Sequence, residues 1–291
     1  MKEIFLNNSQ AKVTIKTKGA ELSSFVSEGI EFIWQGNPSI WNRHAPVLFP
    51  IVGRLKDDTY LVKGKSYNLP QHGFARDREF QILEESETSV SLILKSDEET
   101  FQVYPFQFRL IITYNLSGTS LMVKYAVENP SDEKILFSIG AHPGFNCPLI
   151  PEKETFEDYE IDFHDGLSQR DLFPLSGPFL SEKKSAIQLQ NGRLKLSYDL
   201  FENDALIFDA KLPHKISVKN SLNGRGFSLE YKGFKWLGIW TKKPGAGFIC
   251  LEPWNGIADT LDHDQDFSRK LGINSLAPGD KYEVQYQLNL E

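Results

Sequence analysis

The sequence predicts an all-β protein, either a sandwich or a barrel. Apolar residues alternate with polar ones over many short runs, as in strands that bury one face and expose the other. Turn residues separate these runs, and long stretches with helical spacing of apolar residues are missing from the sequence. Many short strands joined by turns are typical of these two architectures.

The expected strands follow one another along the chain. The clearest alternating runs are residues 90–95, 108–116, 121–127, 159–163, 227–231 and 282–290. Ser117-Gly118 separates the second and third runs and predicts a hairpin. Shorter apolar strands are expected at 135–139, 206–208 and 248–251, and one short helical turn at 98–106.

Length and composition predict one domain over residues 1–291. A large all-β unit often reaches this size, and the sequence has no linker, repeat or low-complexity tract. The 40% hydrophobic content permits a sizeable core. Three irregular stretches, 37–56, 143–157 and 253–269, are long enough to predict functional loops.

The charge and the cysteine content predict which partners and which cell compartment to expect. The formal net charge is −7 and the basic residues are scattered, so we do not expect nucleic acid as a partner. The cysteines, Cys147 and Cys250, suit a reducing compartment. The N-terminal residues are too polar for a signal peptide, and no apolar run reaches membrane-spanning length. We expect a cytoplasmic monomer or homodimer with no membrane partner.

Four short segments place a polar group within an apolar or glycine-bearing stretch. They are residues 49–54 (Phe-Pro-Ile-Val-Gly-Arg), 71–76 (Gln-His-Gly-Phe-Ala-Arg), 140–146 (Gly-Ala-His-Pro-Gly-Phe-Asn) and 249–255 (Ile-Cys-Leu-Glu-Pro-Trp-Asn). Polar groups delivered by strand ends and loops are frequent in binding and catalytic sites.

His142 and Glu252 are the candidate acid–base residues. His142 follows an apolar strand and precedes Pro-Gly, so it lies where the strand ends, and a histidine exchanges protons near neutral pH. Glu252 closes the apolar run 248–251, and desolvation would raise its pKa toward that of a general base. The alternative interpretations are a histidine that braces a turn and a glutamate paired with an arginine.

Further polar or flat side chains are candidates for ligand binding. Trp254 offers an apolar surface suited to the C–H face of a sugar, or it is a core residue. His72, Arg54 and Asp209 each adjoin an apolar or glycine-bearing stretch, and the alternative is a buried ion pair. Arg76 lies in Arg-Asp-Arg, which is also compatible with a solvated turn.

The spacing of the candidate ligands argues against a metal site. Two histidines, an aspartate and a glutamate form a possible ligand set, but their spacing is wide and no HExxH pair is present. The sequence also has no GxGxxG and no P-loop. We therefore expect neither a metal nor another cofactor.

The four segments, in this order, resemble the aldose 1-epimerase (galactose mutarotase) family, and most closely its LacX-type branch. The resemblance runs from residues 19–22 to 276–279. It implies a large antiparallel β-sandwich with a sugar site on a concave face and no cofactor. By resemblance, Glu252 matches the general base and His142 the general acid. His72, Arg54 and Asp209 match residues that bind the sugar.

The substrate class is less closely determined. The segments around Arg54 and His142 lack the Asn-rich and tyrosine-containing motifs of typical galactose mutarotases. The run from His72 to Arg76 instead resembles the hexose-6-phosphate epimerase branch, in which this arginine helps to hold the phosphate. The resemblance implies interconversion of the α and β anomers of a hexose or hexose 6-phosphate. Two alternatives are a non-catalytic carbohydrate-binding module, which the 12% aromatic content would suit, and a metal-dependent sugar isomerase of the cupin type.

Overall fold

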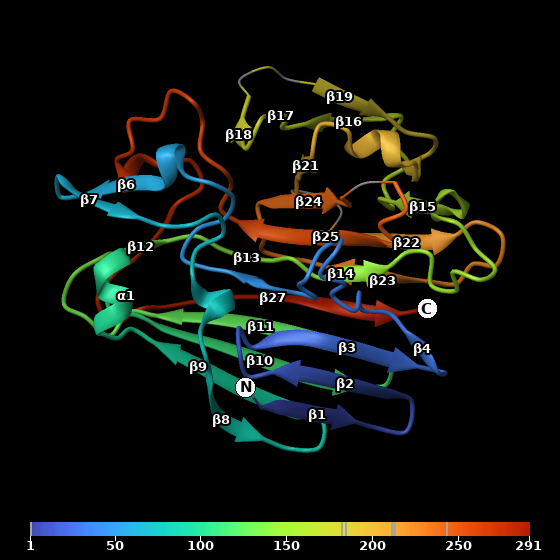
Figure 1. Ribbon diagram of the computed structural model, residues 1–291, viewed down its shortest axis with the longest axis horizontal. Coiled ribbons are helices and arrows are strands. Elements are labelled where there is room, and N and C mark those ends of the chain that lie inside the picture. The colour runs from blue at the N-terminus through green and yellow to red at the C-terminus, as the bar shows by residue number, and fades with distance from the viewer. Residues whose placement is uncertain (1, 182, 184, 211–213, 243) are drawn as a thin grey trace.

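The regular secondary structure of the described residues consists mainly of antiparallel strands, in agreement with the all-β prediction (Figure 1). The computed structural model describes residues 2–181, 183, 185–210, 214–242 and 244–291. Within these ranges the α-helical part is α1 (Glu98–Val103), inside the expected helical segment. The Asp97 side chain accepts from the Thr100 N–H while the Thr100 hydroxyl accepts from the Asp97 N–H, a reciprocal cap that fixes the helix start.

The largest sheet has nine strands and contains all six clearly alternating runs of the sequence. Its strands, in spatial order, are β20 (Arg193–Lys195), β15 (Tyr159–Asp162), β22 (Lys215–Asn220), β23 (Gly226–Glu230), β27 (Lys281–Leu290), β11 (Ser120–Glu128), β10 (Arg109–Ser117), β9 (Ser89–Lys95) and β8 (Gln81–Glu85). The predicted hairpin joins β10 to β11, with Ser117 paired to Ser120. Along β10 every second residue is buried, because one face of the sheet packs on the core and the other meets solvent.

Two further sheets form the second layer of the sandwich. The four-stranded sheet has the order β1 (Glu3–Asn7), β2 (Ala11–Lys16), β3 (Glu21–Ser27) and β4 (Ile30–Glu31). The six-stranded sheet has the order β21 (Leu206–Asp209), β24 (Trp236–Trp240), β25 (Phe248–Asn255), β13 (Ile139–Ala141) and β5 (Val47–Leu48), with β14 (Gly144–Asn146) also paired to β25.

Specific contacts hold the layers together. The Tyr114 hydroxyl of β10 donates to the Ala20 carbonyl at 2.7 Å, beside β3. The rings of Phe145 in β14 and Phe227 in β23 stack with centroids 4.1 Å apart. One hydrophobic cluster extends from Ile4 to Leu290 through all three sheets. The architecture is therefore the antiparallel β-sandwich that the resemblance implied.

The remaining elements are two-stranded sheets and short 3-10 helices. The two-stranded pairs are β12 (Ile135–Phe137) with β26 (Asn274–Leu276), β16 (Gln169–Leu172) with β19 (Ser185–Gln188), β17 (Leu175–Ser176) with β18 (Phe179–Leu180), and β6 (Thr59–Val62) with β7 (Lys65–Asn68). Short 3-10 helices span Lys56–Asp58, Ala75–Asp77, Phe156–Asp158, Tyr198–Phe201 and Phe267–Arg269. The strand expected at 135–139 is divided between β12 and β13, which belong to different sheets, because the Ser138 N–H donates to the Pro50 carbonyl instead of continuing a ladder.

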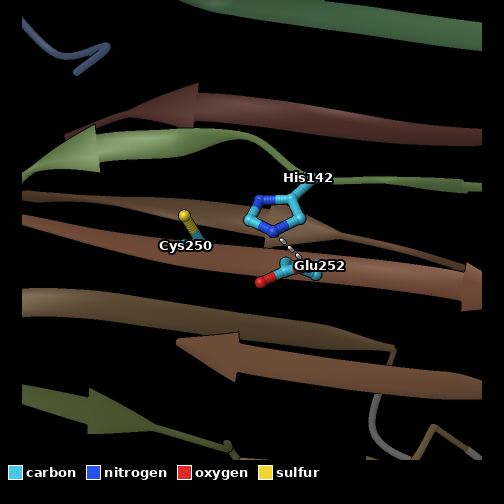
Figure 2. A group of neighbouring side chains, drawn as sticks. All are labelled: His142, Cys250 and Glu252. Atoms are coloured by element: carbon cyan, nitrogen blue, oxygen red, sulfur yellow. Dashed lines mark ion pairs between the residues drawn. The ribbon is translucent and has the colours of Figure 1, made fainter. Parts of the chain in front are cut away.

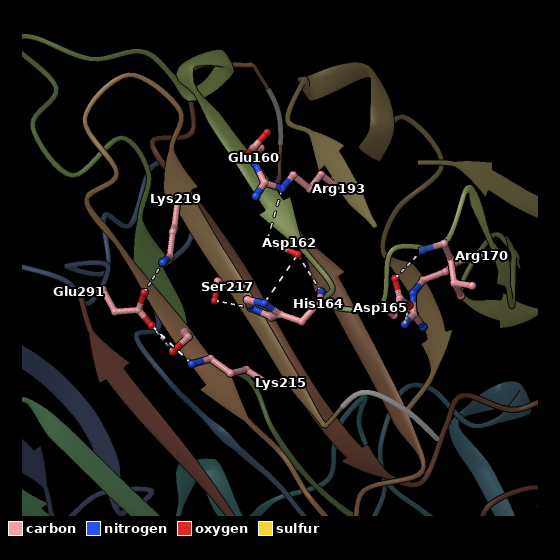
Figure 3. Close-up of polar contacts among 12 residues, drawn as sticks. Glu160, Asp162, His164, Asp165, Arg170, Arg193, Lys215, Ser217, Lys219 and Glu291 are labelled. Atoms are coloured by element: carbon pink, nitrogen blue, oxygen red, sulfur yellow. Dashed lines mark hydrogen bonds and ion pairs between the residues drawn. The ribbon is translucent and has the colours of Figure 1, made fainter. Parts of the chain in front are cut away.

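The outer face of the β20–β15–β22 edge carries polar contacts (Figure 3). Lys219 and Glu291 approach to 2.6 Å, and His164 Nε2 lies 2.8 Å from Ser217 Oγ beside Asp162. Such half-exposed ion pairs add little stability. Ser217 has no exposed surface, so this Asp–His–Ser arrangement does not offer a reachable nucleophile. Within the described ranges, no helix is long and apolar enough to span a membrane.

Candidate active site

The candidate site is built on β25, a strand covered on both faces. All of its residues are buried. Ile249 and Leu251 project into the main core, whereas Cys250 and Trp254 belong to separate clusters on the opposite face. Because side chains alternate along a strand, Glu252 lies on that opposite face too. Burial of both faces of β25 thus explains both the apolar run 248–251 and the buried glutamate that follows it.

Two glycines make room for the Trp254 indole. Gly140 of β13 and Gly238 of β24 flank β25, paired with Trp254 and Glu252 respectively. A Cβ on Gly238 would lie 2.5 Å from Cη2 of the indole, and one on Gly140 would lie 2.7 Å from Cδ1. The indole therefore extends across both neighbouring strands and forms an apolar floor.

His142 lies in the interruption between β13 and β14, both of which pair with β25. This position brings the imidazole over β25, with Nε2 at 3.1 Å from Glu252 Oε2 (Figure 2). Exposure of His142 is 9% and that of Glu252 is 1%. The imidazole packs against the Trp41 and Trp240 rings, at centroid distances of 5.0 and 5.7 Å. The two candidate acid–base residues thus form one buried contact pair.

Burial shifts both partners toward their neutral forms. It raises the pKa of Glu252 well above the usual range of a carboxyl, and the charge of Asp204 adds to the rise. It lowers the pKa of His142 to about 3, and the positive charges of Arg76 and Arg43 add to the fall. A proton held by the pair in the empty site therefore resides on Glu252, beside a neutral imidazole.

His72 is held with a defined tautomer. Its backbone N–H donates to the Gly53 carbonyl at 2.9 Å, and its Nδ1 accepts from the Gly53 N–H at 3.1 Å. Burial lowers the pKa of His72 well below the ordinary value, and the positive form of His142 would lower it further. A neutral ring whose Nδ1 accepts must carry its proton on Nε2. This nitrogen lies 3.4 Å from the side-chain amide of Gln71, which also lines the cavity, so a ligand oxygen would share or replace that contact.

These residues surround a cavity of about 330 Å³, within the range that holds small molecules. It is lined by Trp41, Pro46, Gly53, Gln71, His72, Arg76, His142, Leu175, Pro178, Asp204, Ala205, Ile207, Trp240, Glu252, Trp254 and Ala258. Five candidates from the sequence, His72, Arg76, His142, Glu252 and Trp254, are among them. Of the three irregular stretches, 37–56 and 253–269 contribute to the lining and 143–157 does not.

Arg54 and Asp209 lie outside this lining, contrary to the expectation that they contact the ligand. Arg54 Nε pairs with Asp58 Oδ1 at 2.9 Å in a half-exposed position, and only its neighbour Gly53 faces the cavity. Asp209 shares one face of β21 with Ile207 but lies two residues farther on, opposite Trp236. Local pattern identified both charges, but Arg54 lies in a loop where it pairs with Asp58, and Asp209 ends β21 beyond the part that lines the cavity.

Other lining residues were not singled out from the sequence. Trp41 and Trp240 are not among the candidates named from the sequence, although Trp41 falls in the irregular stretch 37–56. Asp204 and Gln71 carried no signal of their own. They meet at the cavity because β24, which carries Trp240, pairs with β25 and because the segments that hold Trp41, Gln71 and Asp204 fold over the same face.

Comparison with known proteins agrees with the fold. The model of the aldose 1-epimerase family matches residues 2–288. The chain belongs to the aldose 1-epimerase family. Among curated members, the chromosomal and plasmid forms of protein LacX from Lactococcus lactis are each 33% identical over 99% of both chains.

Solved structures of similar proteins show the same fold. A galactose mutarotase related enzyme from Lactobacillus acidophilus superposes with a TM-score of 0.95 at 39% identity, covering 100% of this chain and 97% of that one. A galactose mutarotase-like protein from Lactobacillus casei has a TM-score of 0.92 at 30% identity, with full coverage of both chains. The resemblance seen in the sequence is thus confirmed at the level of family and fold.

Proposed function

We propose that this family member is a mutarotase that interconverts the α and β anomers of a hexose, with Glu252 and His142 as its acid–base pair. The observation that carries the proposal is their 3.1 Å contact at the base of the cavity. Both groups are buried, and both face a space suited to one sugar.

Opening the sugar ring requires one proton to leave the C1 hydroxyl and one to reach the ring oxygen. These two oxygens share carbon C1, so two neighbouring protein groups can each reach one of them. Glu252 as carboxylate takes the hydroxyl proton while His142 as imidazolium gives a proton to the ring oxygen. After rotation about C1–C2, the same steps in reverse close the ring on the other face.

Ring opening converts the charged Glu252–His142 pair into the neutral pair, and the buried site favours the neutral pair. The open-chain intermediate leaves Glu252 protonated and His142 neutral, which is the state that burial already stabilises in the empty site. The carboxylate–imidazolium form that opens the ring must therefore first be made by transfer of the proton from Glu252 to His142, and burial favours the neutral pair that ring opening restores. Acid–base groups of this kind typically contribute about 10²–10⁴-fold each. The single proton never leaves the pair and its substrate.

Other lining residues orient the sugar. The His72 Nε2–H can donate to a hydroxyl, and the indoles of Trp41, Trp240 and Trp254 offer apolar surfaces to C–H groups. Fixing the ring so that both proton transfers align is the positioning contribution to catalysis.

Arg76 favours a hexose 6-phosphate as the substrate. Its side chain lines the cavity and is 16% exposed. Burial lowers the pKa of Arg76 to about 10, and the positive charge of the nearby Arg43 adds to the fall. The two guanidinium groups, with Lys16 and Lys18 nearby, outnumber the two local carboxylates, Glu21 and Asp77, and make this rim attractive to a phosphate. Arg54 is not part of this rim, and Arg43 supplies the second guanidinium group.

The test is the decay of optical rotation of fresh α-glucose, α-galactose and their 6-phosphates. Glu252→Gln keeps the shape of the side chain, and we expect it to lower kcat by about 10²–10⁴-fold. Glu154→Gln, a buried glutamate outside the cavity, is the matched control and should keep the wild-type rate. Wild-type rates no faster than those of Glu252→Gln would overturn the proposal. Sugar binding without acceleration would indicate the non-catalytic module instead.

A further inference from the structure

A third side chain with a metal-ligating atom lies behind His142 and Glu252, and the proposed mechanism does not use it. His142 Nε2, the Cys250 Sγ and a carboxylate oxygen of Glu252 all lie within 4.8 Å of one another (Figure 2). Cys250 and Glu252 project to the same side of β25 because they are two residues apart. Both cysteines are free thiols. The pairing of β13 and β14 with the same strand brings His142 to them.

These three donors match the preferences of Zn²⁺. Thiolate sulfur, imidazole nitrogen and carboxylate oxygen are its usual ligands, and reactive zinc sites combine three protein ligands with one open position. With zinc–ligand distances of about 2.0–2.1 Å, two light ligand atoms of a tetrahedral site lie about 3.3 Å apart. The 3.1 Å between His142 Nε2 and Glu252 Oε2 is close to this spacing.

The cavity gives such an ion access to the three ligands and leaves it one open position. His142 and Glu252 both line the cavity, whereas Cys250 lies behind them with no exposed surface. An ion held by all three would therefore have its fourth position on the cavity side. That position overlaps the place where C1 of the sugar must lie to reach the acid–base pair.

We propose that His142, Cys250 and Glu252 bind one thiophilic divalent cation, and that the bound ion inhibits the epimerase by competing with the sugar. The inhibitory part rests on the proposed function, whereas the binding part rests on the geometry alone. On binding, the Cys250 thiol proton and the proton shared by the pair pass to solvent, and three metal–ligand bonds form. No group is oxidised or reduced. Wide spacing along the chain argued against a resident metal, and the proposal instead concerns an ion that enters in place of substrate.

The binding part is tested with ZnCl₂ and CoCl₂ on the metal-free full chain. Cys250→Ser removes the sulfur ligand, and Cys147→Ser is the matched control, because Cys147 is also a buried free thiol but lies outside the cluster. We expect calorimetry to give one Zn²⁺ per chain for wild type and Cys147→Ser, and at least tenfold weaker binding for Cys250→Ser. Thiolate-to-cobalt charge-transfer absorption should appear in the first two and be absent from the third. Unfolding curves of metal-free samples check that each variant is folded.

The inhibitory part is tested by measuring mutarotation with and without Zn²⁺, each variant being compared with its own metal-free rate. Zn²⁺ should raise the apparent KM of wild type and Cys147→Ser without changing kcat, and affect Cys250→Ser at least tenfold less. Stoichiometric zinc binding in a wild type that shows no mutarotation would remove the proposed function and leave the metal site standing. No stoichiometric binding, or equal affinity in Cys250→Ser, would overturn the site. Activity that requires Zn²⁺ and is lost to a chelator would overturn the inhibition.

Discussion

At the scale of single residues, the chemistry depends on where one proton resides. Glu252 and His142 are ordinary acid–base residues in water, with pKa values of about 4.3 and 6.5. In this site burial reverses their order, raising the pKa of the acid and lowering that of the base. The contact at 3.1 Å then makes them one titrating unit.

This reversal predicts a broad pH plateau for kcat/KM. The pair is active with one proton. A second proton would have to bind His142, whose pKa is lowered to about 3, so activity should fall on the acid side only near that value. The one proton is lost when Glu252 titrates, and its raised pKa moves this loss to higher pH. Rates corrected for spontaneous mutarotation check the profile. A narrow optimum between about 4.3 and 6.5 would contradict it.

Arg76 provides a second prediction at this scale. We expect Arg76→Ala to raise KM for a hexose 6-phosphate about tenfold or more, because hydrogen bonds to charged groups contribute about 1.5–3 kcal/mol. KM for the free hexose should change by less than about twofold. Arg78→Ala is the control, since Arg78 pairs with Asp97 and Glu99 away from the cavity. Equal effects of Arg76→Ala on both sugars would contradict the phosphate role.

At the scale of elements, the site depends on strands whose two faces are both covered. The six-stranded sheet packs on the core with one face and forms the cavity with the other. β25 therefore reads as a continuous apolar run, whereas the half-exposed β10 alternates. Glycines in the strands beside β25 are consequently packing residues that admit the Trp254 indole.

Gly238→Ala tests this arrangement. The new Cβ would lie 2.5 Å from the Trp254 ring, so either the ring or the strand must move. We expect a loss of about 1–3 kcal/mol in the free energy of unfolding and a higher KM, because a displaced indole enters the cavity. Urea unfolding and mutarotation kinetics measure the two effects. In the double variant with Trp254→Phe, the smaller ring should recover part of the stability. Strictly additive losses would contradict the steric explanation.

At the scale of the whole molecule, the nine-stranded sheet supports the layer that carries the site. The stacked rings of Phe145 and Phe227 join β14, next to His142, to β23 of that sheet. Both rings are fully buried and belong to the main hydrophobic cluster. The position of His142, one of the proposed acid–base residues, therefore depends on packing between the layers.

Phe227→Ala should destabilise the protein by about 3–5 kcal/mol, the usual cost of removing a buried aromatic ring. Leu222→Ala is the control, because Leu222 follows β22 in the same hairpin and is 79% exposed. Its effect should stay within about 0.5 kcal/mol. Urea unfolding midpoints and slopes give both values. A loss below about 1 kcal/mol for Phe227→Ala would show that this stack does not hold the layers.

The sequence by itself determined the strands that alternate, the hairpin after β10 and the residue types able to carry acid–base chemistry. It did so because burial of one strand face leaves a local pattern with a period of two. Which polar residues meet was decided by tertiary structure: Arg54 turns outward to Asp58, whereas Trp41 and Asp204 line the cavity. Likewise, only the pairing of β13 and β14 with β25 brings His142 to Glu252 and Cys250. Pairing between strands so far apart in the chain depends on packing of the whole sandwich, and no local pattern records it.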